Sequence, residues 1–137
     1  MTFKQAVNSG WDNKFVFSGR ATRSAFWYWY LFYAIVIIAL ALIEAGVFAG
    51  AAALRNSNST LGTIAMVIGV ILGIVMTVAF IVLIIATVAA SVRRLHDRGQ
   101  SGWFLLLYLV PFGSIIILVF MMLPGTPGDN QYGPVAT

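Results

Sequence analysis

The sequence predicts an all-α, polytopic integral membrane protein with three transmembrane helices and a short N-terminal amphipathic interfacial helix. Composition is the first observation: 61% of the 137 residues are hydrophobic and 9% are charged, whereas a soluble domain is about 25% charged. The second observation is that the apolar residues form runs long enough to cross a hydrocarbon core about 30 Å thick. We therefore expect a single membrane domain over residues 1–137.

Composition and charge also disfavour several kinds of chemistry. The chain has no cysteine, which excludes disulfides, thiolate zinc sites and cysteine nucleophiles. The net charge of +4 comes from basic residues that flank apolar runs, so orientation in a membrane explains it better than nucleic-acid binding. The single histidine is isolated, and a metal site needs three or four ligands. We expect no metal, no cofactor and no nucleic-acid partner.

Residues 1–19 are expected to form a cytoplasmic interfacial segment. Phe3, Val7 and Trp11 fall at helical spacing, which favours a short amphipathic helix in the plane of the interface. Thr2 and Gln5 have the spacing of a capping box, in which the two side chains satisfy free backbone N–H groups at the helix start. A disordered tail is the alternative.

The first transmembrane helix is predicted over residues 24–53. An aromatic cluster at residues 26–33 is typical of the headgroup level of a bilayer. Glu44 is the only acid inside a predicted span, and it is either an interfacial carboxylate that reaches water or a functional group. A polar loop at residues 55–60 then leads to the second helix, predicted over residues 61–92.

Small residues recur every four positions in both of these helices. Gly69 and Gly73 lie in the second, and Gly46 and Gly50 repeat the spacing in the first. Such residues let helix backbones approach closely in a membrane. The pattern predicts that the first two helices pack together at these glycines, and a homodimer face is the alternative.

The third transmembrane helix is predicted over residues 103–123, with Ser101 as its N-cap. Pro111 lacks a backbone N–H, so with Gly113 it should kink this helix near the middle. A re-entrant hairpin that turns at residues 111–113 is the alternative. The polar residues 124–137 are expected as an outside tail.

The polar loop at residues 93–102 is the best candidate for a functional site. We call Arg93, Arg94, His96, Asp97 and Arg98 the arginine knot. If the second helix continues past the membrane, Arg93 and Arg94 can each pair with Asp97, because residues three and four apart share a helix face. A His–Asp pair could hold a general base, but no serine-nucleophile motif accompanies it. The predicted lipid- or partner-binding side chains are Arg20, Arg23, Arg93, Arg94, His96, Asp97, Arg98 and Trp103.

Basic residues predict the orientation. With three spans, seven of the eight lysines and arginines fall on one side, and Arg55 falls on the other. Because cytoplasmic loops carry the excess of these residues, the N-terminus and the arginine knot should be cytoplasmic and the C-terminus outside.

Three ordered motifs resemble the YhaH-like family of bacterial inner-membrane proteins, catalogued as a domain of unknown function, number eight hundred and five. They are FSGRATRSAFW at residues 17–27, RRLHDR at 93–98 with SGW at 101–103, and PGTPGDN at 124–130 with YG at 132–133. The resemblance covers nearly the whole chain. It implies a small multi-pass protein of the bacterial plasma membrane without an established activity, and it supplies no catalytic residues.

The leading functional hypothesis is non-enzymatic. A cytoplasmic collar of arginines and aromatic residues would contact anionic lipid headgroups or a partner membrane protein. One alternative is a subunit of an oligomeric transporter or channel, which needs further copies because three helices with so few polar groups cannot line a pore. The other is a membrane-bound enzyme that uses His96 and Asp97.

Overall fold

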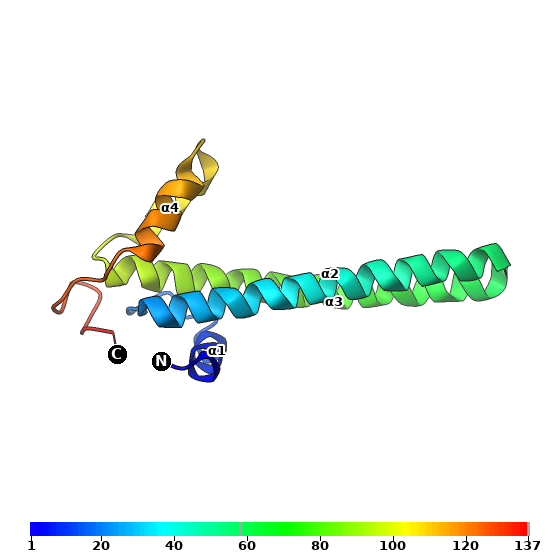
Figure 1. Cartoon of the computed structure of the whole chain (residues 1–137), viewed down its shortest axis with the longest axis horizontal. Coiled ribbons are helices and arrows are strands. Elements are labelled where there is room, and N and C mark those ends of the chain that lie inside the picture. Colours follow the sequence, from blue (N-terminus) through cyan, green and yellow to red (C-terminus); the bar gives the residue numbers. More distant parts are fainter. Residues whose placement is uncertain (58, 137) are drawn as a thin grey trace. The chain divides into compact units, whose positions relative to one another are not determined.

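The computed structural model describes residues 1–57 and 59–136, and its ordered elements are all helical. They are α1 (Phe3–Asp12), α2 (Arg23–Ser57), α3 (Ser59–Asp97), the 3-10 helix η1 (Gly102–Leu109) and α4 (Gly113–Met122) (Figure 1). The described residues contain no strand, only an isolated bridge between Asn130 and Gly133. The all-helical prediction is confirmed. The chain divides into two compact units, Tyr33–Val82 and a second unit that joins Met1–Phe32 to the segment beginning at Leu83.

Helices α2 and α3 are long and apolar enough to cross a membrane, as predicted for residues 24–53 and 61–92. Both are longer than predicted, with 35 and 39 residues. At about 1.5 Å per residue each exceeds a core about 30 Å thick. Most of the predicted loop at 55–60 is helical, apart from Asn58, which lies outside the described residues. The predicted polar loop at 93–102 is also wrong in part, because α3 continues to Asp97.

Helix α1 begins with the predicted capping box: Gln5 N donates to Thr2 Oγ1, and Thr2 N donates to Gln5 Oε1 at 2.8 Å. The face of α1 that packs against the protein is not the apolar face formed by Phe3, Val7 and Trp11. Ala6 and Gly10 are buried, and a Cβ at Gly10 would overlap the Trp29 ring. Phe3 and Trp11 are exposed instead. The small residues face the protein because only they let the backbone reach the indole.

In the unit Tyr33–Val82, α2 and α3 lie side by side (Figure 1). The structure places Gly69 and Gly73 against α2. A Cβ on Gly69 would stand 3.1 Å from Val47 Cγ1, and one on Gly73 would stand 2.7 Å from Glu44 Oε1. The predicted role of Gly46 and Gly50 is wrong, since a Cβ at either would meet nothing within 4 Å. The glycines of α3 therefore receive side chains of α2, and the two glycine pairs do not meet.

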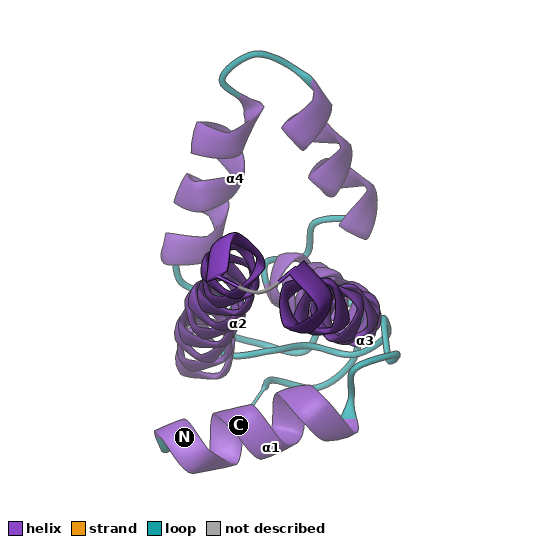
Figure 2. Cartoon of the chain, turned by 90° about the vertical axis from the view of Figure 1, so that its right-hand side faces the viewer, coloured by secondary structure: helices purple, strands orange, loops and turns teal. Residues whose placement is uncertain are grey.

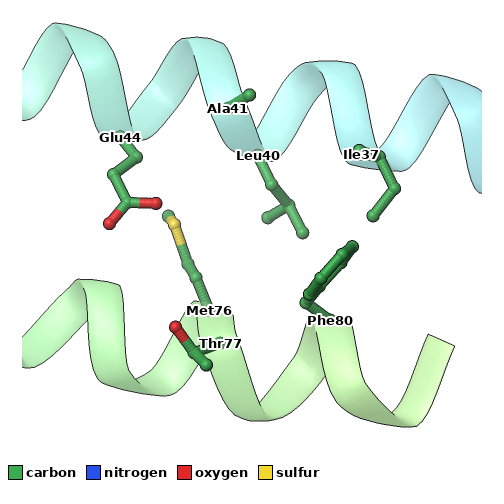
Figure 3. A pocket seen from close by; sticks show the side chains of 7 residues that line it. All are labelled: Ile37, Leu40, Ala41, Glu44, Met76, Thr77 and Phe80. Atoms are coloured by element: carbon green, nitrogen blue, oxygen red, sulfur yellow. The ribbon is translucent and has the colours of Figure 1, made fainter. Parts of the chain in front are cut away.

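Glu44 lines a cavity of about 190 Å³ in this unit. Figure 3 shows its carboxylate directed from α2 towards Met76 on α3, while Leu40 and Ile37 approach Phe80. Glu44 is partly exposed. The acid thus faces the groove between the helices, with Gly73 leaving room for it.

The segment predicted as one kinked helix over residues 103–123 is a hairpin, so that prediction is wrong and the alternative turn at 111–113 is the observed one. Figure 2 shows η1 and α4 as two arms joined by a loop. Pro111 has no N–H to continue a helix, Phe112 is left-handed with φ 64°, and Gly113 N donates to Val110 O at 3.0 Å. A Cβ on Gly113 would overlap Leu107 O, so the reversal requires glycine there.

Neither arm of the hairpin can cross a bilayer. η1 has 8 residues and α4 has 10, or about 16 Å and 15 Å at their usual rises, against a core about 30 Å thick. Among the described residues, two helices rather than the predicted three are long enough to span.

Candidate functional site

Asp97, at the end of α3, joins segments that are distant in the sequence. Its Oδ1 accepts from Arg20 Nε at 3.0 Å, and its Oδ2 accepts from Arg94 Nη1. The side chain is buried with 6% exposed, so both guanidinium groups are needed to offset the loss of hydration. The predicted i,i+3 pair of Arg94 with Asp97 is confirmed. Among the described residues Arg93 does not form an ion pair with Asp97.

Arg94 is fully buried, and all its bonds are internal. Its exposed fraction is 0%. Nε donates to Met121 O at 3.2 Å and Nη2 donates to Leu123 O. These carbonyls belong to the end of α4, where no helical N–H remains to bond them. Arg94 therefore fastens the hairpin to α3, which removes it from the side chains available to a ligand.

The polar tail returns to the arginine knot. Thr126 N donates to Asp97 O at 2.9 Å, and Asn130 Nδ2 donates to His96 O at 2.9 Å. Arg20 Nη1 donates to Gly128 O at 2.8 Å. The prediction that residues 124–137 lie across the membrane from the knot is therefore wrong for residues up to 136. The tail supplies donors to the last carbonyls of α3, which otherwise have no partner.

The side chains of His96 and Asp97 are bonded to other groups and not to each other in the described part of the chain. His96 Nδ1 lies 3.2 Å from Gly19 O, and its ring stacks on Tyr132 with centroids 3.8 Å apart and planes 1° from parallel. Gly19 has φ 82°, a left-handed conformation that glycine adopts easily. The carboxylate is bonded to two arginines instead, and the imidazole is oriented by Gly19 O and Tyr132.

Arg93 is a buried arginine of the knot whose terminal nitrogens have no partner in the described part of the chain. It is 8% exposed, and its Nε donates to Ala89 O at 3.3 Å. Its two terminal nitrogens have no acceptor among the described residues. With Ser9, Arg20 and Thr22 it lines a cavity of about 330 Å³. These two nitrogens are therefore open to a ligand in the cavity, and an anion there would supply acceptors for them.

The remaining predicted side chains lie at the edge of this cluster. Arg23 is exposed, although it shares the lining of a cavity of about 220 Å³ with Arg94 and Asp97. Arg98 Nη1 donates to Pro124 O at 3.3 Å, and its guanidinium lies 5.2 Å from the Phe120 ring. Trp103 is 78% exposed. The structure thus joins Arg20, Arg94 and Asp97 directly and leaves Arg23 and Trp103 outside that hydrogen-bonded set.

Sequence reasoning missed the residues that close the site from the tail. Thr126, Asn130 and Tyr132 contact the last turn of α3, and a Cβ on Gly125 would overlap the Asp97 carboxylate. These residues belong to the PGTPGDN and YG motifs, which carry the family resemblance and were expected in the outside tail. Their polar side chains directly after an apolar run were the available signal.

Comparisons with known proteins agree with these motifs. The family described as "Protein of unknown function (DUF805)" matches residues 14–134. Inner membrane protein YhaI of Escherichia coli K12 is 35% identical over 118 residues, which cover 85% of this chain and 82% of YhaI. Inner membrane protein YhaH of the same organism is 53% identical over 47 residues, which are 34% of this chain and span 39% of the length of YhaH. No solved structure matches the chain. The predicted resemblance is confirmed: this chain belongs to the DUF805 family.

Proposed function

We propose that this protein is a non-enzymatic protein of the bacterial inner membrane that binds the phosphate of anionic phospholipids on its cytoplasmic face, at Arg93. The names of YhaH and YhaI place those relatives in the inner membrane, and the two long apolar helices of this chain fit the same location. The predicted collar contained Arg20, Arg23, Arg93, Arg94, Arg98 and Trp103. The proposal assigns phosphate binding to Arg93, with Arg23 adding attraction to the anionic surface.

The unsatisfied end of Arg93 is the observation that carries the proposal. The guanidinium groups of Arg94 and Arg20 donate hydrogen bonds to Asp97 and to backbone carbonyls of the protein. Arg93 is also buried, but it lines a cavity and its terminal nitrogens have no acceptor among the described residues. A guanidinium matches phosphate oxygens in a bidentate geometry. Arg23, exposed at the same end of the protein, adds long-range attraction to an anionic surface.

Location favours a lipid over a free anion. Arg93 follows directly after the apolar part of α3, at the level where lipid phosphates lie if α3 spans the bilayer. The hairpin has both ends at the arginine knot and exposes apolar side chains along its length, Leu109 and Phe112 among them. We propose that it enters the bilayer from the cytoplasmic side and returns, so that lipid surrounds the site.

Lipid retention tests this proposal. The full chain is reconstituted in nanodiscs that contain phosphatidylglycerol and phosphatidylcholine in equal amounts. It is then released from the nanodiscs in the mass spectrometer, and the lipids that stay bound are identified by native mass spectrometry. We expect the wild type to retain phosphatidylglycerol and Arg93→Gln to retain at least about tenfold less, because a charge-assisted hydrogen bond contributes about 1.5–3 kcal/mol. Arg55→Gln is the matched control, since it removes the same charge from the other unit.

Two outcomes would contradict the proposal. If Arg93→Gln retained phosphatidylglycerol as the wild type does, Arg93 would not be the site. If inorganic phosphate raised the unfolding temperature in pure phosphatidylcholine nanodiscs as much as phosphatidylglycerol does, the ligand would be a soluble anion. Arg93→Lys keeps the charge and loses the planar fork, so we expect intermediate retention.

A subunit of an oligomeric transporter is the second candidate, and Glu44 favours it. This acid faces a groove between apolar helices, and acids within membrane spans often serve ion or substrate pathways. A pathway would need further copies or another protein. Native mass spectrometry from mild detergent would then give an oligomer, and Glu44→Gln would abolish its activity in liposomes. A monomer would exclude this function for the chain on its own.

A further inference from the structure

A second cavity, distinct from the one at Arg93, lies between α3 and η1. Its volume is about 530 Å³, within the range of about 300–1,000 Å³ that is usual for small-molecule sites. α3 and η1 approach closely beside it, because a Cβ on Gly102 would stand 2.8 Å from Val92 Cγ1. The cavity is lined by Phe17, Val88, Val92, His96, Ser101, Gly102, Trp103, Leu105, Leu106 and Tyr132.

The lining is apolar along most of its length and carries a single imidazole. Val88, Val92, Leu105 and Leu106 offer hydrocarbon surface, while His96 lies at the last turn of α3. No lysine, arginine, aspartate or glutamate takes part in the lining. A charged head would therefore lose its hydration without gaining a counter-charge. The cavity suits a neutral head on a hydrocarbon chain.

His96 determines the polarity that this head must have. The exposed fraction of the residue is 9%. Its Nδ1 faces a carbonyl oxygen, that of Gly19, so Nδ1 must carry the proton and donate. In a neutral imidazole the other nitrogen then accepts. Nε2 has no hydrogen-bond partner within the described part of the chain, so it can accept a hydrogen bond from a bound molecule.

We propose that this cavity binds a neutral amphiphile whose hydroxyl head donates to His96 Nε2 and whose hydrocarbon chain lies along Val88, Val92, Leu105 and Leu106. Neutral glycerolipids and isoprenoid quinols share this chemistry. The tryptophan at the cavity, Trp103, is largely exposed, as is Leu106, and a bound chain would cover this apolar surface.

Photolabelling tests the site in the full chain, reconstituted in phosphatidylcholine nanodiscs. The probe is a long-chain alcohol with a diazirine on its chain, compared with its methyl ether, which cannot donate. We expect the wild type to be labelled about fivefold more by the alcohol than by the ether, as one ordinary hydrogen bond predicts. Peptide mapping should place the label on residues of the cavity, not on the exposed Ile115 of α4.

Three variants separate the head from the chain. His96→Leu removes both ring nitrogens and leaves an apolar side chain, so the alcohol should lose its advantage over the ether, while unchanged labelling by the ether shows that the cavity persists. Leu106→Trp fills the cavity, so labelling by both probes should fall. Ile115→Trp adds the same ring to an exposed position of α4 that does not line the cavity, and it should label as the wild type does.

Competition identifies the source of the hydroxyl. Unlabelled dioleoylglycerol or ubiquinol-2 should reduce labelling, and the one that does so names the class of ligand. Equal labelling of the wild type by alcohol and ether, or competition by neither compound, overturns the proposal. This result is independent of the phosphate site, because the probes are uncharged and Arg93→Gln should leave their labelling unchanged.

Discussion

Arg93 and Arg94 are neighbours in sequence but differ in what surrounds them. The guanidinium of Arg94 donates hydrogen bonds to three groups, the Asp97 carboxylate and the carbonyls of Met121 and Leu123. The terminal nitrogens of Arg93 face a cavity. The fold therefore supplies acceptors for all three guanidinium nitrogens of Arg94 and for only one of the three of Arg93.

A matched pair of substitutions tests this difference. Arg94→Met leaves Asp97 with one guanidinium and two carbonyls without a donor, so we expect it to lower the free energy of unfolding by about 3–5 kcal/mol. Arg93→Met removes a charge that the protein does not satisfy, so in uncharged detergent we expect a change of less than about 1 kcal/mol. Chemical unfolding of both variants in that detergent is the measurement. Equal destabilisation would show that Arg93 is also held by the fold.

At the scale of elements, the α2 and α3 pair in Tyr33–Val82 packs glycine against larger side chains. Gly69 receives Val47 and Phe48, and Gly73 receives Glu44. Between membrane helices there is little hydrophobic driving force, so close van der Waals contact at small residues decides how they associate. Gly46 and Gly50 face open space, and lipid or another protein can cover them.

Gly69→Leu and Gly46→Leu should therefore differ although the chemical change is the same. Leucine raises helix propensity at both positions, but only at Gly69 would its side chain meet Val47, 3.1 Å from the added Cβ. We expect Gly69→Leu to lower the unfolding temperature in detergent and Gly46→Leu to leave it unchanged or raise it. If Gly46→Leu were the damaging change and also dissociated an oligomer, Gly46 would lie on an interface between copies.

The hairpin is the element that most changes the interpretation of the chain. Pro111 alone is compatible with a kinked span. The left-handed Phe112 and the contact of Gly113 with Leu107 turn the chain back instead. The carbonyls at the end of α4 then reach Arg94. Residues 103–123 are apolar enough to cross the membrane, but they end beside α3, the helix that precedes them in the chain.

At the scale of the whole molecule, the start of α2, the end of α3 and the described tail meet at one site. Ala21 N donates to Arg93 O at 3.0 Å, and Arg20 bonds both Asp97 and the tail. The tail carries no lysine or arginine, so the positive-inside rule says little about the side of the membrane on which the tail lies. If both long helices span the membrane, we expect from the positive-inside rule that the whole site lies in the cytoplasm.

Single-cysteine labelling tests this topology cleanly because the chain has no cysteine of its own. With a membrane-impermeant maleimide on intact cells, we expect Leu61→Cys to react and Gln100→Cys and Gly128→Cys to react only after permeabilisation. Gly128 is suitable because a Cβ there meets nothing within 4 Å. Reaction of Gly128→Cys in intact cells would show that the tail lies outside, and it would contradict the hairpin as the arrangement in the membrane.

The sequence by itself determined the features that depend on local pattern. Apolar runs indicated the two helices that are long and apolar enough to span, although they also predicted a third span that the structure does not have. The Thr2 and Gln5 spacing indicated the cap of α1, and the spacing of Arg94 and Asp97 indicated their ion pair. The motifs indicated the family. Each of these follows from residues within one helix turn or one uninterrupted segment, where the spacing of side chains is known before any packing is formed.

Only the tertiary structure decided how the distant pieces meet. Hydropathy is the same for a helix that crosses and for two arms that turn back, because it counts apolar residues and not the direction of the backbone. The reversal depends on Phe112, on Gly113 and on Arg94 bonding the end of α4. Likewise, all the arginines of the knot have the same charge in the sequence, and only their surroundings leave the terminal nitrogens of Arg93 without an acceptor in the described chain.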